Sequence, residues 1–492
     1  MNDTALWRWA RWGGAVAGVA LALIAVNACP PELTAKHCSK DADCPECSSC
    51  DRGLGLCYLS NECPGGKCRH ESCCIGCWQG DSCVDGTSLD ACGREGGDCQ
   101  ACDPNGACDN RACIPPPVSD LALTDVTTCA VRYDGTVWCF GESNYPQLGN
   151  GMSSGASAYP RQVVRADSDA MLSGIVDVDG SDVVFCARDG EGVIWCWGDG
   201  VGGQLGNGSD ADLDRAGAVL SGSGTPLPGF GQFEVGAGHA CGLRSAGEVW
   251  CWGSNQAGQL SQGDGADTSS WFPVAMLAPD NSRLQGVTQV AVGDRFTCMI
   301  RTDRTVWCVG DGGYGQLGNG TWNSYTLPVE VMTSSSSALA NVAQVSCGSL
   351  TSCARTGDGK VYCWGRGEEG QLGNGTGSSS QYAVQVADLQ GVTDLAVGQD
   401  YACAALQDNS VWCWGTNGSA QLGDGTVLGR SRPARTMFDR SSGHPVLIAP
   451  GNGHTALLLD NGQMWGWGSN SRGQLGVPTT LQPQVMVPQT IP

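Results

Sequence analysis

Positive charge is scarce in this sequence. It holds 27 lysine and arginine residues against 49 aspartate and glutamate residues, for a formal net charge of −22 at pH 7, and nowhere does it concentrate basic residues into a patch. Proteins that bind nucleic acid or anionic lipid by charge need such a patch, because contacts to phosphate supply much of their affinity. The composition therefore argues against a nucleic-acid partner and against electrostatic docking on a membrane.

Residues typical of catalytic and metal sites are also few. The chain has five histidines, and two of them, His239 and His454, share a repeat position that other copies fill with Thr, Val, Phe or Tyr, which indicates a structural position. Asp-Gly pairs such as Asp134-Gly135 read as turns rather than calcium loops. We find neither a Gly-rich phosphate loop nor a Ser-His-Asp set. The sequence predicts no catalytic residue, metal or cofactor, so the protein is not expected to be an enzyme.

The N-terminal apolar run, over residues 13–26, is short for a membrane span. Two arginines precede it and small residues follow, so residues 1–28 are expected to be an export signal. Its end fits two cleavage chemistries: an ordinary peptidase cut, or a bacterial lipobox in which Cys29 carries the lipid. We favour lipidation of Cys29. The expected location is then the bacterial cell envelope, at the outer membrane or surface, through the lipid anchor alone; the alternative is a secreted protein.

Cysteine is abundant and unevenly distributed. Of the 30 cysteines, 17 lie before residue 114, a density typical of a disulfide scaffold rather than of a chain with a large apolar core. We expect a small, loop-dominated disulfide module over residues 29–113, whose pairing the spacing leaves open. Its paired CxxC motifs could instead hold zinc. Residues 114–117 contain three consecutive prolines, which predict a stiff spacer in front of residues 118–492.

One unit returns seven times in residues 118–492. Its core is a Trp-Cys run such as Val137–Gly141, trailed by a Gln-Leu pair, and successive copies are spaced by 50–57 residues. Each copy reads as four short strands, and a repeat of this size is typical of a propeller blade. The sequence predicts an all-β fold, a seven-bladed β-propeller preceded by the disulfide-rich module. The repeated glutamines are Gln147, Gln204, Gln259, Gln316, Gln371, Gln421 and Gln474.

In six copies two cysteines lie ten residues apart. Folding residues 129–139 as a hairpin pairs Arg132 with Thr136 and leaves a three-residue loop that ends at Gly135, where a left-handed conformation is needed. Counting outward makes the two cysteines a non-hydrogen-bonded pair, whose α carbons come close enough for a disulfide. The alternative is buried free thiols. The predicted disulfides are Cys129–Cys139, Cys186–Cys196, Cys241–Cys251, Cys298–Cys308, Cys353–Cys363 and Cys403–Cys413.

The remaining residues of the Trp-Cys runs are expected to fill the ring. The seventh copy has Ala456 and Gly466 in place of the cysteines, so both partners are absent together. Tryptophans such as Trp195 and Trp197 point away from the sulfur between them, and we expect them to pack between blades. Cys347, in an apolar repeat position, is expected to be a buried small hydrophobe.

The residues Gly238–Leu243, Gly247–Gly253 and Gly258–Leu260 together form a unit that is similar to the repeat of the regulator of chromosome condensation family. The resemblance covers residues 118–492. It implies a seven-bladed propeller in which a C-terminal strand near residues 484–487 pairs with the first blade. For activity it implies, as one alternative, a guanine-nucleotide-exchange-like regulator. The founding members are nuclear, however, and an exported acidic chain is closer in setting to a secreted bacterial relative that inhibits β-lactamases.

Aromatic residues collect where the units vary most, between the Gly-rich turn and the following proline. Exposed aromatics on loops at one end of a ring are candidate binding anchors. We expect a monomeric, non-catalytic cell-surface protein that binds an extracellular or surface protein through one face. The alternative is a binder of glycan or cell-wall polysaccharide that uses the same residues. Tyr159 and Phe272 are expected to pack beneath the loops, and the candidate binding residues are Tyr145, Trp271, Trp322, Tyr325 and Tyr382.

Overall fold

The computed structural model describes residues 117–263, 269–477 and 484–491, together with short strands between Ser48 and Ile114. Two compact units divide the chain: Leu6–Pro117 forms one, and Val118–Pro492 forms most of the other. The predicted export signal and Cys29, and the pairing of the cysteines in residues 29–113, lie outside the described residues.

The strands described in the N-terminal unit are short and pair mainly as antiparallel hairpins, for example β1 with β2. Their bounds are β1 (Ser48–Asp51), β2 (Leu56–Leu59), β3 (Lys67–Arg69), β4 (Ser72–Cys74), β5 (Cys77–Gln79), β6 (Ser82–Val84), β7 (Thr87–Ser88), β8 (Ala91–Cys92), β9 (Gly97–Asp98), β10 (Ala107–Asp109) and β11 (Ala112–Ile114).

The C-terminal unit is a ring of seven four-stranded antiparallel sheets, which confirms the predicted seven-bladed β-propeller. Each sheet is one blade whose strands, here named a to d, follow one another in the chain. Blade 1 is β12 (Val118–Leu123), β13 (Thr127–Arg132), β14 (Val137–Ser143) and β15 (Gly155–Gln162); blade 2 is β16 (Ile175–Ser181), β17 (Val184–Asp189), β18 (Ile194–Gly198) and β19 (Leu213–Ala218); blade 3 is β20 (Phe230–Val235), β21 (His239–Arg244), β22 (Val249–Gly253) and β23 (Ser270–Ala275).

The other four blades repeat this order. Blade 4 is β24 (Val287–Val292), β25 (Phe296–Arg301), β26 (Val306–Gly310) and β27 (Tyr325–Glu330); blade 5 is β30 (Val342–Cys347), β31 (Thr351–Thr356), β32 (Val361–Gly365) and β33 (Ser380–Gln385); blade 6 is β34 (Val392–Val397), β35 (Tyr401–Leu406), β36 (Val411–Gly415) and β37 (Arg430–Arg435); blade 7 is β38 (Pro445–Pro450), β39 (His454–Leu459), β40 (Met464–Ser469) and β41 (Gln484–Ile491). The connections hold the hairpin β28 (Met332–Ser334) and β29 (Ser337–Ala338) and the 3₁₀ turns η2 (Ser245–Gly247) and η3 (Arg440–Ser442).

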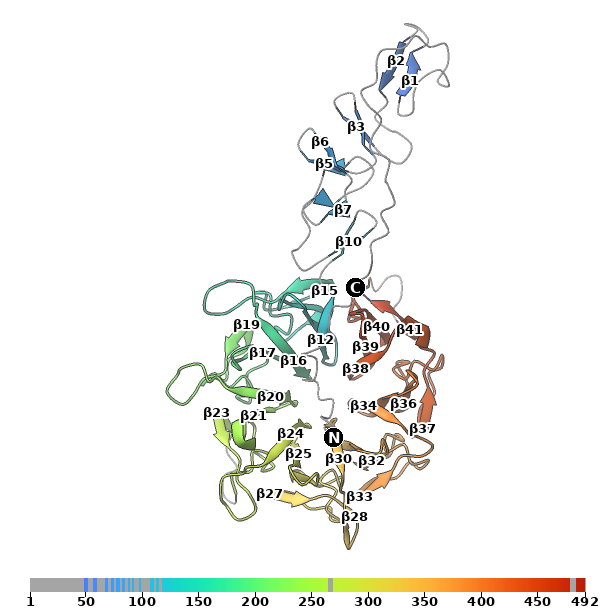
Figure 1. The fold of residues 1–492 in the computed structure, drawn as a ribbon. Helices are drawn as coiled ribbons and strands as arrows, with labels where there is room; N and C mark the ends of the chain where they lie inside the picture. The colour runs from blue at the N-terminus through green and yellow to red at the C-terminus, as the bar shows by residue number, and fades with distance from the viewer. Residues whose placement is uncertain are drawn as a thin grey trace, which may run out of the picture. The chain divides into compact units, whose positions relative to one another are not determined.

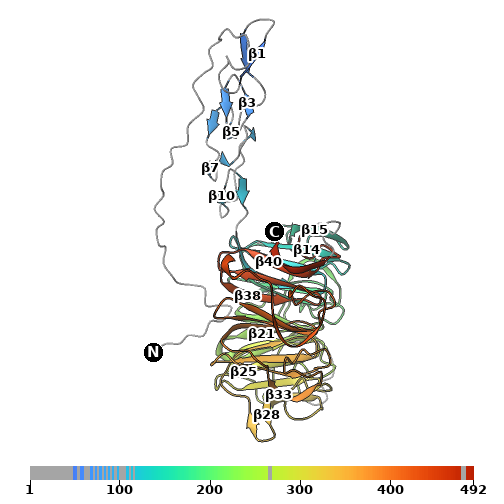
Figure 2. The same ribbon diagram turned by 90° about the vertical axis from the view of Figure 1, so that its right-hand side faces the viewer.

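The ring has two distinct faces. Strand a of each blade lies at the centre and strand d at the rim (Figure 1), and the strands run from one face to the other (Figure 2). Because each blade is an antiparallel meander, its a–b turn and c–d connection emerge on one face, here called the loop face. The b–c hairpins and the d–a connections emerge on the opposite face, here called the hairpin face.

The hairpin geometry follows the sequence prediction. The Arg132 N–H donates to the Thr136 carbonyl oxygen at 3.0 Å, and Gly135 has a left-handed φ of 79°. Cys129 lies directly opposite Cys139 with 4.1 Å between the α carbons, and a disulfide joins each of the six predicted pairs. This Cα separation is typical of a non-hydrogen-bonded pair.

The predicted closure of the ring is wrong. Strand β41 pairs with β40 of its own blade, and blade 1 supplies all four of its own strands. Blade 7 instead meets blade 1 through individual contacts: the Thr128 hydroxyl donates to the Gln474 carbonyl oxygen at 2.7 Å and lies 3.1 Å from His454 Nε2. The Val118 N–H also donates to the Gly462 carbonyl oxygen at 3.3 Å, so the ring closes like its other joints, through individual contacts rather than through a shared sheet.

The joints between blades depend on the second aromatic of each Trp-Cys run. The indole N–H of Trp414 donates to the Gln371 carbonyl oxygen of the preceding blade at 2.9 Å. A Cβ on Gly373 would lie 2.7 Å from the same indole nitrogen, so at these joints the Gly after the Gln-Leu pair makes room for the ring. This confirms the predicted packing and adds a hydrogen bond. The five tryptophans, all fully buried, are Trp197, Trp252, Trp364, Trp414 and Trp467.

Two joints lack this tryptophan, and both keep the glutamine carbonyl paired. Val309 replaces Trp in blade 4, and Ser261 stands where the preceding blade would have the accommodating Gly. The Gln259 carbonyl oxygen then accepts from the Thr297 hydroxyl at 3.1 Å. In blade 1, Phe140 occupies the Trp position. There the Thr128 hydroxyl, rather than an indole, donates to the Gln474 carbonyl oxygen. In the joint between blades 3 and 4, the larger Ser261 and the smaller Val309 have therefore replaced Gly and Trp together.

We expect Val309→Trp alone to destabilise the ring by about 1–3 kcal/mol, because Ser261 occupies the space that the indole needs. Adding Ser261→Gly should restore that space and recover most of the loss, since the pair then matches the other joints. Urea unfolding followed by intrinsic fluorescence measures both variants. A double variant no more stable than Val309→Trp would contradict the compensation.

Candidate functional site

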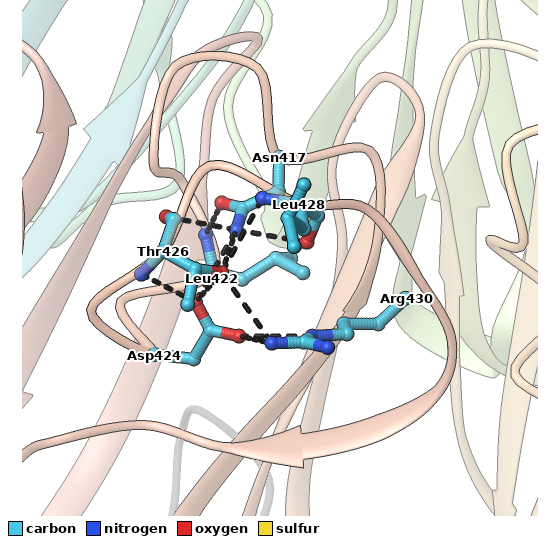
Figure 3. Close-up of polar contacts among 6 residues, drawn as sticks. All are labelled: Asn417, Leu422, Asp424, Thr426, Leu428 and Arg430. Carbon is cyan, nitrogen blue, oxygen red and sulfur yellow. Dashed lines mark hydrogen bonds and ion pairs between the residues drawn. The ribbon is translucent and has the colours of Figure 1, made fainter.

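The c–d connections of the loop face are held by internal hydrogen bonds. In blade 6 the Asn417 side-chain amide donates to the carbonyl oxygens of Thr426 and Leu428 at 3.0 and 3.1 Å (Figure 3). The Asp424 carboxylate, whose side chain is 6% exposed, accepts two bonds from the Arg430 guanidinium at 3.0 and 2.8 Å. A loop held in this way loses little conformational freedom when it binds a partner.

Exposed hydrophobic side chains are concentrated on the loop face. Thirteen large apolar side chains are exposed among the described residues, and seven of them lie in the c–d connections, with Trp271 at the second position of a strand d. The hairpin face has four, including Tyr133. The residues in the c–d connections are Tyr145, Met152, Val201, Tyr314, Trp322, Val427 and Leu428.

Three of the five candidate binding residues gather around the c–d connection of blade 4. Trp322 is 48% exposed, and its ring lies 2.9 Å from where a Cβ on Gly315 would be. Tyr325 is half-buried against the core of blade 4, and Tyr382 of blade 5 is half-buried against Gly320. Trp322 is thus the aromatic of this group that solvent reaches most, and the two tyrosines support the loop beneath it.

Tyr314, 43% exposed, belongs to the same connection and was not among the candidate residues. Its backbone N–H donates to Gln316 Oε1 at 2.8 Å, as that of Tyr145 does to Gln147 Oε1. The two tyrosines therefore occupy one repeat position. Aligning the units on their glutamines would have found Tyr314 from Tyr145.

Of the remaining aromatic side chains, some are exposed to solvent and others pack within the ring. Trp271 is 47% exposed and covers Gly203 of the preceding blade, next to the exposed Val201. Phe272 packs against Gly208, as predicted. The corresponding prediction for Tyr159 is wrong, because its side chain is 63% exposed; its place in blade 1 is in strand β15, where the register shifts against β14.

The centre of the loop face is acidic. The a–b turns bring together Asp125, Asp182 and Asp294 from blades 1, 2 and 4. Burial, and then the charge of Asp182, raise the pKa of Asp125 to about 6. Burial also raises the pKa values of Asp182 and Asp294, each with a nearby carboxylate as a further cause. A cation or basic side chain would therefore be favoured here over an anion.

His239 and His454 are structural, as the sequence indicates. Both are fully buried between blades, and their Nε2 atoms lie 2.9 and 3.1 Å from the hydroxyls of Thr297 and Thr128. Burial lowers the pKa of each to about 3. Both imidazoles are therefore neutral at pH 7 and serve the joints between blades.

These two histidines predict a loss of stability in acid. Because their folded pKa values lie below the usual value near 6.5, the unfolded state binds more protons between about pH 6.5 and 3, and the free energy of unfolding should fall by up to about 1.4 kcal/mol per pH unit for each His. Protonation of Asp125 near pH 6 acts in the opposite sense. Denaturant titrations from pH 7 to 4 should show a shallower decline in His454→Gln and a steeper one in Asp125→Asn. Equal slopes in all three proteins would contradict the assignment.

Other kinds of site find little support in the part of the chain that the structure describes. There, the structure forms no group of three or more His, Cys, Asp or Glu residues arranged for a metal ion, and contains no helix of the length and apolarity that a membrane span requires. Cys347, which was predicted to be buried, is only half-buried. Its thiol lies 3.7 Å from the Ser352 hydroxyl, and desolvation raises its pKa to about 12, which keeps it protonated at pH 7.

Comparison with known proteins shows which family the chain resembles. Residues 221–492 match the family model of the RCC1-like domain. Over 377 residues the chain is 30% identical to the human E3 ubiquitin-protein ligase HERC2. The matched region covers 75% of this chain but only 6% of the ligase. Over 373 residues it is 27% identical to the ultraviolet-B receptor UVR8 of Arabidopsis thaliana, covering 74% of this chain and 80% of the receptor.

A solved structure supports the fold. Prp20p from Saccharomyces cerevisiae superposes with a TM-score of 0.61 at 19% sequence identity, over 74% of this chain and 87% of Prp20p. The seven blades of one repeat agree with the family model, which matches more than half of the residues. This chain belongs to the family of proteins with an RCC1-like domain.

Proposed function

We propose that the ring is a non-catalytic binding module that recognises a protein partner through its loop face. The concentration of exposed apolar side chains on that face carries the proposal, because aromatic anchors on pre-ordered loops supply most of the energy of protein interfaces. The acidic centre of the face favours a partner with basic residues. The solved structure of Prp20p was described together with its binding to Gsp1p and histones, which is consistent with a ring that binds proteins.

The experiment compares two exposed aromatic sites on opposite faces. A partner captured from an extracellular proteome with the intact protein should bind Trp322→Ala/Tyr314→Ala at least about tenfold more weakly, since loss of an aromatic anchor typically costs over 1 kcal/mol. Tyr133→Ala, which removes an equally exposed aromatic from the hairpin face, is the matched control. Equal loss in both variants, or in neither, would remove the loop face from the interaction.

A glycan or cell-wall polysaccharide remains the second candidate, because half-exposed Trp271 and Trp322 could also stack on sugar rings. A soluble polysaccharide should then compete with binding, and a protease-treated target should still bind. Either result would favour the glycan over the protein partner. An exchange-factor role would require the uncleaved, reduced chain in the cytosol.

For location, we propose that the chain is exported and held at the cell envelope by a lipid on Cys29, with the partner outside the cell. The proposal is supported by the predicted export signal and the predicted proline spacer of the sequence. Mass spectrometry of the native N-terminus tests it. A diacylated or triacylated Cys29 is expected, whereas an unmodified N-terminus after the signal would show secretion.

A further inference from the structure

A cavity of about 300 Å³ opens on the hairpin face between blades 4 and 5. Its walls come from the d–a connection of blade 4, which includes the hairpin β28–β29, and from the b–c hairpin of blade 5. The cavity is on the face opposite to the proposed protein-binding loops, and the inference below does not depend on them. Its principal lining residues are Thr333, Leu339, Asn341, Asp358, Lys360 and Tyr362.

Two other joints of the ring show what can fill this place. Tyr362 holds the position just before the second cysteine of its unit, where blade 2 has Trp195. In the joint between blades 1 and 2, the guanidinium carbon of Arg165 lies 4.2 Å from the centroid of the Trp195 ring. A side chain from the d–a connection therefore covers the aromatic ring of the next blade.

Thr333 occupies the position of Arg165. The residue before each donates its backbone N–H to the glycine carbonyl oxygen that follows its Gln-Leu pair: Val164 to Gly149 at 2.9 Å, and Met332 to Gly318 at 2.8 Å. The same register places Phe438 in this position in the joint between blades 6 and 7, where its ring lies 5.2 Å from that of Trp465. Two joints thus place a planar group against the ring, and Phe438 does so edge-on, at 87° to Trp465. Thr333 is too short to do so, as are Ser221 and Ala278, which the same register places in this position in the joints between blades 2 and 3 and between blades 3 and 4.

The residues that line the cavity favour one of these two planar groups, the guanidinium, over the other, the phenyl ring. Phe438 is buried in an apolar cluster, whereas the open cavity is lined by an amide and a carboxylate. Asn341 Oδ1 already accepts from the Arg304 guanidinium at 3.3 Å. In the joint between blades 1 and 2, Asp167 holds the Arg165 guanidinium through two hydrogen bonds, of 3.0 and 2.6 Å. Asp358 offers a carboxylate beside Tyr362, although it comes from the b–c hairpin of blade 5 rather than from the d–a connection that carries Asp167.

Lys360 competes for that carboxylate but does not block it. Its ammonium lies 2.8 Å from Asp358, and the two side chains are 45% and 51% exposed. Ion pairs this exposed contribute little and exchange readily. A guanidinium can pair with the carboxylate in the plane of its fork and lie flat on an aromatic ring, which an ammonium cannot do.

We propose that this cavity binds the guanidinium of an arginine side chain supplied by a partner protein. The arginine would lie on the face of Tyr362, donate to Asp358, and take the place that Arg165 holds in the joint between blades 1 and 2, three joints earlier in the chain. The proposal therefore identifies a second contact site, on the hairpin face, with arginine as its chemical class.

The probe is N-acetyl-L-arginine methylamide, titrated into the intact protein and followed by saturation-transfer NMR. We expect saturable binding in the millimolar range, and binding at least about threefold to tenfold weaker for the citrulline analogue, which keeps the shape and lacks the charge. Tyr362→Ala and Asp358→Asn should each weaken binding to a similar degree. Thr333→Arg should abolish it by filling the cavity from within, with a melting temperature no lower than that of the parent.

Several results would overturn the proposal. Equal binding of the citrulline or the lysine analogue would show that the cavity does not select a guanidinium. Unchanged arginine binding by Thr333→Arg would place the probe elsewhere, and no saturable binding at tens of millimolar would leave the cavity without this ligand. Asp358→Asn alters an exposed side chain, so its result does not depend on whether the larger substitutions fold.

Discussion

Replacement of Trp414 by alanine is expected to lower the free energy of unfolding of the ring by about 3–5 kcal/mol, the usual cost of removing a large buried aromatic side chain. The side chain is fully buried between blades 5 and 6, and its indole N–H donates to the Gln371 carbonyl oxygen. The substitution therefore opens a cavity and leaves a buried carbonyl without its donor. Urea unfolding at neutral pH measures the change.

Trp412 is the matched control, because it lies two residues away in the same strand and is only half-buried. Trp412→Ala should cost clearly less. A finer comparison uses phenylalanine: Trp414→Phe removes the bond to Gln371, whereas after Trp467→Phe the Gln421 carbonyl oxygen still accepts from the Thr455 hydroxyl at 2.8 Å. Trp414→Phe should be the more destabilising by about 1 kcal/mol or more. The reverse order would contradict the role given to the carbonyl.

Reduction of the six hairpin disulfides is expected to unfold the ring. Each closes a loop of about ten residues and stabilises by roughly 3 kcal/mol through the entropy of the unfolded chain. Six such bonds contribute on the order of 15–20 kcal/mol, at least as much as the whole stability of a typical domain. Protein unfolded and reduced in denaturant, then diluted with the reductant retained, should not recover native tryptophan fluorescence.

The twelve sulfurs are all buried, so a reductant added to folded protein should act slowly and does not by itself test the claim. Oxidised protein taken through the same unfolding and dilution is the control. Loss of one bond should be tolerated, since blade 7 folds with Ala456 opposite Gly466. Reduced protein that refolds with the oxidised midpoint would show that the Trp-centred joints alone suffice.

The candidate site was predicted only in part, and the physical reason is visible in Tyr382. Its place after a Gly-rich turn suggests an exposed loop aromatic, yet strand d of blade 5 lies against the c–d connection of blade 4 and half-buries the ring on Gly320. Tyr159 shows the opposite error for the same reason. It was expected to pack beneath the loop but is exposed, because its exposure depends on how strand β15 meets its neighbours. Exposure on a rim is set by contacts between blades, which a single unit does not contain.

What the sequence determined by itself is local. The seven copies of the repeat set the number of blades, and the ten-residue cysteine spacing set the hairpin register, because each blade and each hairpin is encoded within one short stretch of chain. The tertiary structure alone decided that β41 stays in its own blade, that Trp414 pairs with Gln371, and that a cavity lies above Tyr362. The last two depend on side chains that meet across a joint from different repeats, where volume and hydrogen bonding, rather than spacing along the chain, select the arrangement. The first depends on which sheet edge the last strand reaches, which the repeat pattern does not state.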